Sequence, residues 1–254
     1  MAAGTKLVKI WAAMRTSDAA SCPPMLFVFN ECGLSGQITL SKTTGKGKKV
    51  GAIHWQISTE AYICIPDWLR KGWEIFVPLI DSRKCNLPLP SKDLDGFSDK
   101  APDYSRSCAV NYKLMASCKK VMNSDHTGEV CQDSDLLFMD GVQGFWSGHS
   151  DRPTLTSWAS ILGHPGEHIE MIGRWSPSSS EEYIRTAKTT VLRLQAAVAK
   201  AIREAGQEDI LGKAAWADQL DAYLTERGIP SELIFEQLTS LMAWHRINVS
   251  PEDE

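Results

Sequence analysis

The chain has 254 residues, of which 43% are hydrophobic and 23% charged, and its formal net charge is −4 at pH 7. These values are typical of an ordinary globular protein, and the lack of any run of about 18 apolar residues argues against a membrane-spanning helix. The N-terminus has no apolar signal-peptide core, and the seven cysteines follow no regular spacing. We therefore expect a nuclear or cytoplasmic protein with reduced thiols, not a secreted one.

Positive charge is concentrated near the start of the chain. Residues 1–60 carry seven Lys or Arg and three Asp or Glu, whereas residues 181–254 carry eight and thirteen. The acidic excess therefore lies in the C-terminal part. A basic N-terminal surface that attracts nucleic acid is compatible with the net negative charge.

The first part of the chain predicts one helix followed by a small sheet. Residues 5–20 are predicted to be helical. Short runs of β-branched and aromatic residues then predict strands over residues 26–29, 37–40 and 51–55. Glycines in this region are expected to supply turns: Gly33, Gly36, Gly45 and Gly47. The lysine-rich segment 42–49 is expected to connect the second and third strands.

The rest of the chain predicts mainly helices. A helix is expected over residues 61–76, with Trp68, Leu69 and Trp73 facing inward. Residues 81–106 are rich in Pro, Asp and Ser and predict a long irregular connection. Further helices are expected over residues 107–122, 150–162, 167–172, 178–186, 189–205, 216–227 and 231–244. A small antiparallel sheet among many helices gives an α+β fold class.

Residues suited to phosphate chemistry occur in the second half of the chain. His149 and Arg152 are three residues apart, which places them on one side of a helical turn. Arg offers planar, bidentate donors for a phosphate, and His can transfer a proton near neutral pH. Trp175 follows 23 residues after Arg152, and Tyr183 eight residues later. Singly, Tyr183 fits an aromatic residue of an amphipathic helix and Trp175 a core aromatic.

Two residues of the first part complete a longer pattern. Arg15 is followed by Asp18, and Lys42 lies 27 residues after Arg15 in the sequence Ser-Lys-Thr-Thr-Gly. In order and spacing, these positions resemble the signature of the tyrosine recombinase (phage integrase) family. The Gly-Arg-Trp-Ser sequence around Trp175 and the Tyr-Ile-Arg-Thr sequence from Tyr183 are similar to the branch found in eukaryotic mobile elements. The resemblance runs from Arg15 to Ala205.

The resemblance implies DNA strand cleavage and rejoining by transesterification, as in DNA recombination and integration. Tyr183 is expected to attack the scissile phosphate and form a 3′-phosphotyrosyl bond. Arg15 and Arg152 are expected to clamp the non-bridging oxygens as negative charge builds on them. Because the phosphotyrosyl bond stores the energy for rejoining, no metal and no nucleotide cofactor is implied.

Three further residues are expected to assist this reaction. Trp175 is expected to donate its indole N–H to the phosphate. Lys42 is expected to protonate the leaving 5′ oxygen as a general acid, and His149 to assist proton movement at the tyrosine.

The implied partner is double-stranded DNA, on which the protein is expected to self-associate. Nearby lysines are expected to contact the DNA backbone: Lys46, Lys48 and Lys49. Neither a membrane nor a small-molecule ligand is expected as a partner.

Residues 1–205 are expected to form the catalytic domain, and residues 206–254 a C-terminal helical extension. Because only 14 residues precede Arg15, we expect no counterpart of the family's usual N-terminal DNA-gripping domain. Pro153 is expected to push Arg152 toward an extended conformation and to displace its guanidinium. The alternative is a truncated or degenerate mobile-element fragment that keeps the fold and at most binds DNA without catalysis.

Two other interpretations have less support in the sequence. A type IB topoisomerase shares the chemistry, but members of that family are usually longer and more basic. Cys118, His126 and Cys131 are candidate zinc ligands, yet no Cys-x-x-Cys pair exists and their spacings fit no common zinc finger.

Overall fold

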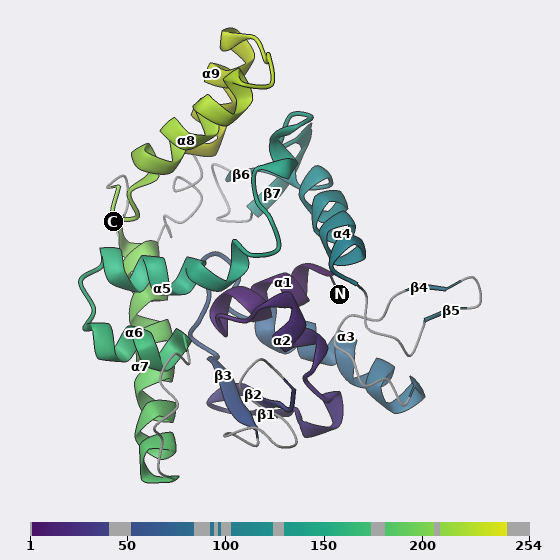
Figure 1. The fold of residues 1–254 in the computed structure, drawn as a ribbon, viewed down its shortest axis with the longest axis vertical. Helices are drawn as coiled ribbons and strands as arrows, with labels where there is room; N and C mark the ends of the chain where they lie inside the picture. Colours follow the sequence, from purple (N-terminus) through teal and green to yellow (C-terminus); the bar gives the residue numbers. More distant parts are fainter. Residues whose placement is uncertain are drawn as a thin grey trace.

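The computed structural model describes residues 2–40, 52–83, 92–93, 96–97, 103–123, 130–173, 181–205 and 209–242. The helices are α1 (Ala2–Trp11), α2 (Thr16–Ala20), α3 (Trp68–Arg83), α4 (Tyr104–Ala116), α5 (Asp151–Ile161), α6 (Gly166–Gly173), α7 (Glu181–Glu204), α8 (Lys213–Thr225) and α9 (Ser231–Met242). The strands are β1 (Val28–Asn30), β2 (Gly33–Ile38), β3 (Ile53–Ser58), β4 (Lys92–Asp93), β5 (Gly96–Phe97), β6 (Lys119–Asn123) and β7 (Val130–Leu136). Two 3-10 turns complete the description, η1 (Pro24–Leu26) and η2 (Val142–Gly144). The predicted combination of many helices with small antiparallel sheets is confirmed (Figure 1).

Buried apolar residues interrupt the N-terminal helix that the sequence predicts over residues 5–20. α1 ends at Trp11, and α2 begins at Thr16. Between them the side chains of Ala12, Ala13 and Met14 are at most 3% exposed, and Ala13 adopts a φ of +47°. The prediction of one continuous helix is therefore wrong, because tertiary packing outweighs local helix propensity here.

The three predicted strands exist, displaced by a few residues, and form an antiparallel sheet in the order β1-β2-β3. Gly36 was expected in a turn, but it lies inside β2 and pairs with Trp55 of β3. A Cβ at Gly36 would come within 2.6 Å of the Trp55 ring. The glycine is needed because the indole packs directly on the backbone. Gly33 does follow a turn, with a φ of +139°, whereas Gly45 and Gly47 lie outside the described residues.

The main core joins this sheet to α1, α3, α5, α6 and α7. α7 is one continuous helix, so the two helices predicted over residues 178–186 and 189–205 are merged. Gln195 of α7 is fully buried. Its amide donates to the carbonyl oxygens of Trp11 at 2.7 Å and Gln56 at 2.9 Å, and it accepts the Ser58 N–H at 2.8 Å. These bonds fix α7 against the end of α1 and against β3.

A second, smaller core lies where α8 and α9 meet the segment around η2. Its buried apolar residues come from both sides: Phe138, Val142, Leu220, Leu224, Ile234 and Leu241. The Gln237 side chain of α9 accepts the Met139 N–H at 2.6 Å and donates to the Leu137 carbonyl at 3.0 Å. In Figure 1, α8 and α9 extend from the body on the side where β6, β7 and α4 lie. The C-terminal helices thus share a core with a middle segment of the chain.

The region between the sheet and α5 shows three differences from prediction. The helix expected over residues 61–76 is shifted to α3, although Leu69 is buried and Trp68 and Trp73 pack against the core as expected. α4 begins inside the segment predicted to be irregular, because the Asp103 side chain caps it by accepting the Arg106 N–H at 2.7 Å. α4 also ends at Ala116. The residues that follow pair as β6 with β7, a long-range contact that helical periodicity does not indicate.

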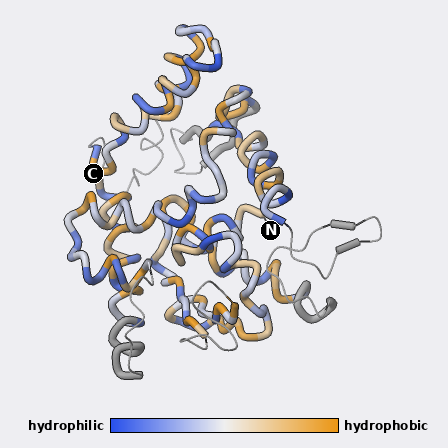
Figure 2. The backbone as a smooth tube through the Cα atoms, viewed as in Figure 1, coloured by the Kyte–Doolittle hydropathy of each residue, from blue (hydrophilic) through white to orange (hydrophobic). Residues whose placement is uncertain are grey.

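Hydrophobic and hydrophilic residues alternate along most helices, as the colouring of the backbone shows (Figure 2). Among the described residues, no helix is both long enough and apolar enough to cross a membrane.

Candidate active site

Two arginines that are far apart in the sequence lie beside one carboxylate. Arg15 immediately precedes α2, and its backbone N–H donates to Asp18 Oδ2 at 3.0 Å. Arg152, in the first turn of α5, places Nη1 3.5 Å from the same oxygen. The Asp18 side chain is only 5% exposed. We call Arg15, Asp18 and Arg152 the arginine cluster.

The arginine cluster carries more positive than negative charge. Burial lowers the pKa of Arg152 from its ordinary value, and the neighbouring charge of Arg15 lowers it further, whereas Asp18 raises it. The positive charge of Arg15 therefore acts on Arg152, with one carboxylate beside them. Such an arrangement attracts an anion, since an anion relieves the repulsion that one carboxylate leaves.

Arg152 also connects α5 to the end of α6. Its Nη2 donates to the carbonyl oxygen of Gly173 at 3.0 Å, and Gly173 is the last residue of α6. The segment that continues from Gly173 carries Trp175 and leads into α7, which contains Tyr183. Arg152 thus contacts the residue from which the chain continues to Trp175 and Tyr183, the two remaining predicted site residues of this half of the chain.

The expected effect of Pro153 on Arg152 is not found. Arg152 is the second residue of α5 and has helical geometry, and its N–H donates to the His149 carbonyl at 3.3 Å. Pro153 occupies the next position in the first turn, where its missing N–H costs nothing. The predicted extended conformation of Arg152 is therefore wrong, because the proline stands where a helix tolerates it.

His149 lies just before α5 and is exposed. Its backbone N–H donates to Ser147 Oγ at 3.2 Å. Its imidazole ring lies 5.5 Å from the ring of Tyr104, at an interplanar angle of 36°. The described partner of His149 is thus a tyrosine of α4, which the sequence analysis did not single out.

Close packing around Gly148 brings a further polar group near Arg15. A Cβ at Gly148 would lie 3.3 Å from Thr16 Oγ1 and 3.6 Å from the Tyr104 ring. Thr16 Oγ1 is buried and has no hydrogen-bond partner among the described residues. A buried hydroxyl without a partner is uncommon. Thr16, which directly follows Arg15, is therefore a candidate site residue that sequence reasoning missed, because a single threonine carries no motif.

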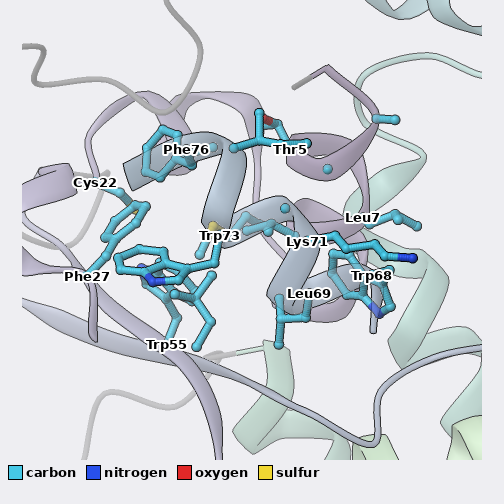
Figure 3. Close-up of a pocket in the computed structure, with 18 residues that line it drawn as sticks. Thr5, Leu7, Cys22, Phe27, Trp55, Trp68, Leu69, Lys71, Trp73 and Phe76 are labelled. Carbon is cyan, nitrogen blue, oxygen red and sulfur yellow. The ribbon is translucent and has the colours of Figure 1, made fainter. Parts of the chain in front are cut away.

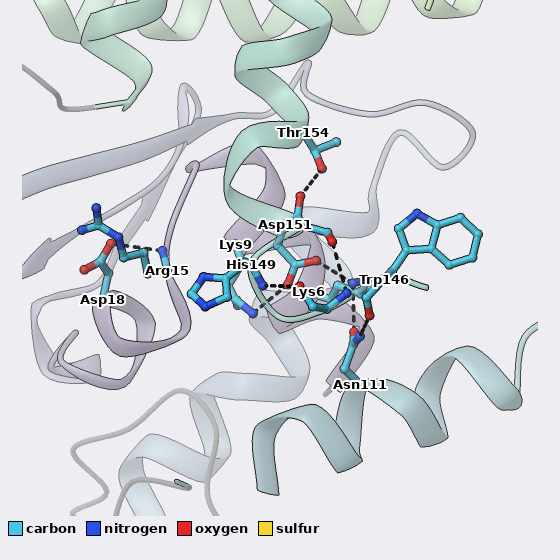
Figure 4. A network of polar contacts seen from close by, with 11 residues as sticks. Lys6, Lys9, Arg15, Asp18, Asn111, Trp146, His149, Asp151 and Thr154 are labelled. Carbon is cyan, nitrogen blue, oxygen red and sulfur yellow. Dashed lines mark hydrogen bonds and ion pairs between the residues drawn. The ribbon is translucent and has the colours of Figure 1, made fainter. Parts of the chain in front are cut away.

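A second charged cluster lies beside the first and was also missed. Asp151, 3% exposed, accepts ion pairs from Lys6 at 2.5 Å and from Lys9 at 2.7 Å. Lys6 also donates to Asn111 Oδ1 at 2.9 Å. We call Lys6, Lys9 and Asp151 the lysine cluster; Figure 4 shows it together with Arg15, Asp18 and His149. Two of the seven cations near the N-terminus are thus bound inside the protein, which reduces the basic surface that charge counting suggested.

Several predicted site residues cannot be placed. Lys42, Lys46, Lys48, Lys49 and Trp175 lie outside the described residues. The backbone of Tyr183 belongs to the first turn of α7, but its side chain lies outside the description. The structure therefore brings together Arg15 and Arg152, with His149 two residues before α5, and leaves the other positions as predictions.

The candidate zinc ligands are not brought together in the described part of the chain. Within it, no group of three or more His, Cys, Asp or Glu side chains could hold a metal ion. His126 lies outside that part. Burial raises the pKa of Cys118 above the ordinary value of a thiol, which disfavours the thiolate that zinc requires.

Comparisons with known proteins identify no relative of this chain. No protein-family model matches the chain, and neither a curated protein nor a solved structure matches it.

Proposed function

We propose that this protein cleaves and rejoins DNA strands in the manner of a tyrosine recombinase, with residues 1–205 as its catalytic domain and residues 206–254 as a helical extension. Tyr183 Oη forms a bond to the scissile phosphorus, and the bond from phosphorus to the 5′ oxygen breaks. His149 assists removal of the tyrosine proton, and Lys42 delivers a proton to the leaving 5′ oxygen. Attack by a 5′ hydroxyl reverses these steps and reseals the strand.

The observation that carries this proposal is the proximity of Arg15 and Arg152. They are 137 residues apart in the sequence, yet the Arg15 backbone N–H lies 3.0 Å and Arg152 Nη1 3.5 Å from Asp18 Oδ2. Phosphoryl transfer depends mainly on positioning and on stabilising charge at the phosphate oxygens. The Arg152 guanidinium, with Arg15 beside the same carboxylate, is assigned to both requirements, since an arginine can bind a phosphate through two parallel hydrogen bonds.

Three further groups are assigned around this pair. Trp175 follows Gly173, whose carbonyl Arg152 contacts at 3.0 Å, and it is assigned to the phosphate. Lys46, Lys48 and Lys49 are assigned to the DNA backbone, where each neutralises one phosphate.

The deciding experiment traps the covalent intermediate. The full chain is incubated with a nicked DNA duplex whose cleavage releases a short fragment, and the adduct is separated by denaturing electrophoresis. Tyr183→Phe is expected to abolish the adduct while leaving DNA binding unchanged, because only the nucleophilic oxygen is removed.

A matched control is available at Tyr104, the tyrosine that lies beside His149. A hydrogen bond with Cys108, and then desolvation, raise the pKa of Tyr104, so its hydroxyl is less readily deprotonated. Tyr104→Phe is therefore expected to keep the adduct. If the adduct were lost in Tyr104→Phe and persisted in Tyr183→Phe, the nucleophile would be Tyr104 and not Tyr183.

One observation favours the second candidate function, DNA binding without cleavage. Both terminal nitrogens of Arg152 already face protein oxygens, Nη1 at Asp18 and Nη2 at Gly173. An arginine whose donors are satisfied in this way can stabilise the fold without binding a phosphate. Salt-sensitive DNA binding without any trapped adduct, even with the unmodified chain, would establish this function in place of the first.

A further inference from the structure

The aromatic ring of Tyr104 lies against the imidazole of His149. The two ring centres are 5.5 Å apart, and the ring planes are inclined by 36°. Aromatic rings attract each other in tilted and offset arrangements of this kind. Since the carbonyl oxygen of His149 accepts the N–H of Arg152 at 3.3 Å, the contact joins α4 to the loop that leads into the arginine cluster.

The backbone of His149 is fixed, whereas its side chain is exposed. The backbone N–H donates to Ser147 Oγ at 3.2 Å, and the carbonyl accepts the Arg152 N–H. Among the described residues, the imidazole itself has one printed partner, the Tyr104 ring. An exposed side chain without such a partner samples several rotamers. The orientation of the imidazole therefore depends on Tyr104.

Tyr104 is itself held at the start of α4. Asp103 caps the helix by accepting the Arg106 N–H at 2.7 Å, and the Tyr104 hydroxyl is hydrogen-bonded to Cys108, one turn further along. Gly148 lets the loop before α5 come close, because a Cβ there would lie 3.6 Å from the Tyr104 ring. The ring is thus a fixed surface for its neighbour.

This contact is separate from the apolar pocket that lies between α1, α3 and the first sheet (Figure 3). Neither Tyr104 nor His149 lines that pocket. A substitution at Tyr104 is therefore not expected to alter the packing of α1 on α3.

We propose that Tyr104 is a positioning residue for His149, whose imidazole its ring holds in the orientation that assists removal of the tyrosine proton. The inference rests on the role of His149 in the proposed function. It assigns the effect to the ring of Tyr104 and not to its hydroxyl. It also gives α4 a part in the site, which the sequence analysis did not expect.

The first test follows His149 by NMR in the DNA-free full chain with isotope-labelled histidine. His149→Gln identifies its resonance among the six histidines. Tyr104→Leu is expected to move this resonance, because the ring current of the tyrosine is lost, and Tyr104→Phe is expected to move it much less. Tyr112→Leu is the matched control, since Tyr112 lies on the same helix and is 41% exposed, against 50% for Tyr104.

The second test measures the rate of adduct formation on the nicked duplex at saturating DNA. Tyr104→Leu is expected to slow it by about three- to ten-fold, the range that one aromatic contact can account for, without changing the DNA concentration that gives half the maximal rate. Tyr104→Phe is expected to restore most of the rate. Tyr112→Leu is expected to leave it unchanged.

A double variant shows whether Tyr104 acts through His149. In the His149→Gln background, Tyr104→Leu is expected to slow the reaction no further, because the group that it positions is already absent. Equal slowing by Tyr104→Leu with and without His149 would assign its effect to the fold and overturn the inference.

The two tests separate this inference from the proposed function. Normal cleavage by Tyr104→Leu would overturn the inference and leave the proposed function intact. If the unmodified chain formed no adduct, the proposed function would fail, and the NMR comparison would still decide whether Tyr104 orients His149. A His149 resonance that moves no more in Tyr104→Leu than in Tyr112→Leu would overturn the inference in either case.

Discussion

The lysine cluster and the arginine cluster have the same composition in charge, two cations and one carboxylate, and adjacent residues of α5 contribute to them. In the lysine cluster, both oxygens of Asp151 are bound, at 2.5 and 2.7 Å, and the Lys9 side chain is only 9% exposed. In the arginine cluster, the guanidinium of Arg152 lies 3.5 Å from Asp18, and the Arg152 side chain is 17% exposed, between the values for Lys9 and Lys6. The first cluster is closed around its carboxylate, whereas the second is looser.

The difference shows that charge count alone does not identify a binding site. The ion pairs of a closed cluster stabilise the folded protein, and removing one partner leaves a buried charge unpaired. A looser cluster keeps donors that can be redirected to an incoming anion. We therefore expect substitutions in the lysine cluster to change stability, and substitutions in the arginine cluster to change the reaction with DNA.

The largest expected effect is that of Asp151→Asn. It leaves Lys6 and Lys9 without their carboxylate, and we expect the free energy of unfolding to fall by about 3–5 kcal/mol, measured by urea denaturation. Replacing all three residues together, with Lys6→Met, Lys9→Met and Asp151→Leu, is expected to recover most of that loss. Near-normal stability of Asp151→Asn would mean that the lysine cluster does not hold α1 against α5.

Arg152→Lys tests the arginine cluster. We expect it to slow adduct formation by about 100-fold, nearly as much as Arg152→Ala, because lysine keeps the charge but loses the bidentate fork. Its urea midpoint is expected to change much less than that of Asp151→Asn. If the lysine variant cleaved DNA at close to the normal rate, Arg152 would act only through its positive charge and not through bidentate hydrogen bonds.

A smaller effect is expected at the lysines outside the described residues. Changing Lys46, Lys48 and Lys49 to Gln is expected to reduce the slope of log affinity against log salt by about 0.9 for each phosphate that is no longer neutralised. Fluorescence anisotropy at several salt concentrations measures this slope. Lys200→Gln removes an exposed lysine of α7 and serves as the control. Equal slopes in the triple variant and the control would exclude this segment from the DNA interface.

The smallest effect concerns His164, a half-buried group in neither cluster. Burial lowers its pKa, and the nearby charge of His168 lowers it further. The unfolded chain therefore binds a proton at a higher pH than the folded chain does. The contribution of His164 to stability is present above the ordinary histidine pKa and is lost as pH falls through its lowered folded value. His164→Gln is expected to flatten this part of the stability profile, whereas an unchanged profile would assign the dependence to other groups.

Much of the local structure could be predicted because it depends on local pattern. Helical periodicity correctly indicated α5, α6, α8 and α9, and β-branched and aromatic runs indicated the first sheet. The break between α1 and α2 was missed because Ala12, Ala13 and Met14 look helical in isolation. Only their burial against distant elements favours the left-handed turn at Ala13.

The candidate site was predictable only in part. Arg15 and Arg152 were singled out through a family pattern, and the structure brings them together. The pairing of Lys6 and Lys9 with Asp151 spans more than 140 residues and follows no motif. Thr16 and Tyr104 were missed for the same reason, since their importance comes from what the fold packs beside them.

Gln195 has a mechanical consequence for the far end of α7. Its amide clamps the middle of that helix to α1 and β3, and Gln56 adds a second clamp by donating to the Lys188 carbonyl at 2.6 Å. Tyr183 stands twelve residues before Gln195, about 18 Å along a helix. α7 is thus held at two points, and Tyr183 stands five residues, or about 7.5 Å of helix, before the second of them. A tilt of a few degrees at Lys188 moves the backbone of residue 183 by about half an ångström. The position of the proposed nucleophile therefore depends on two neutral amides, Gln195 and Gln56, that lie outside the arginine cluster.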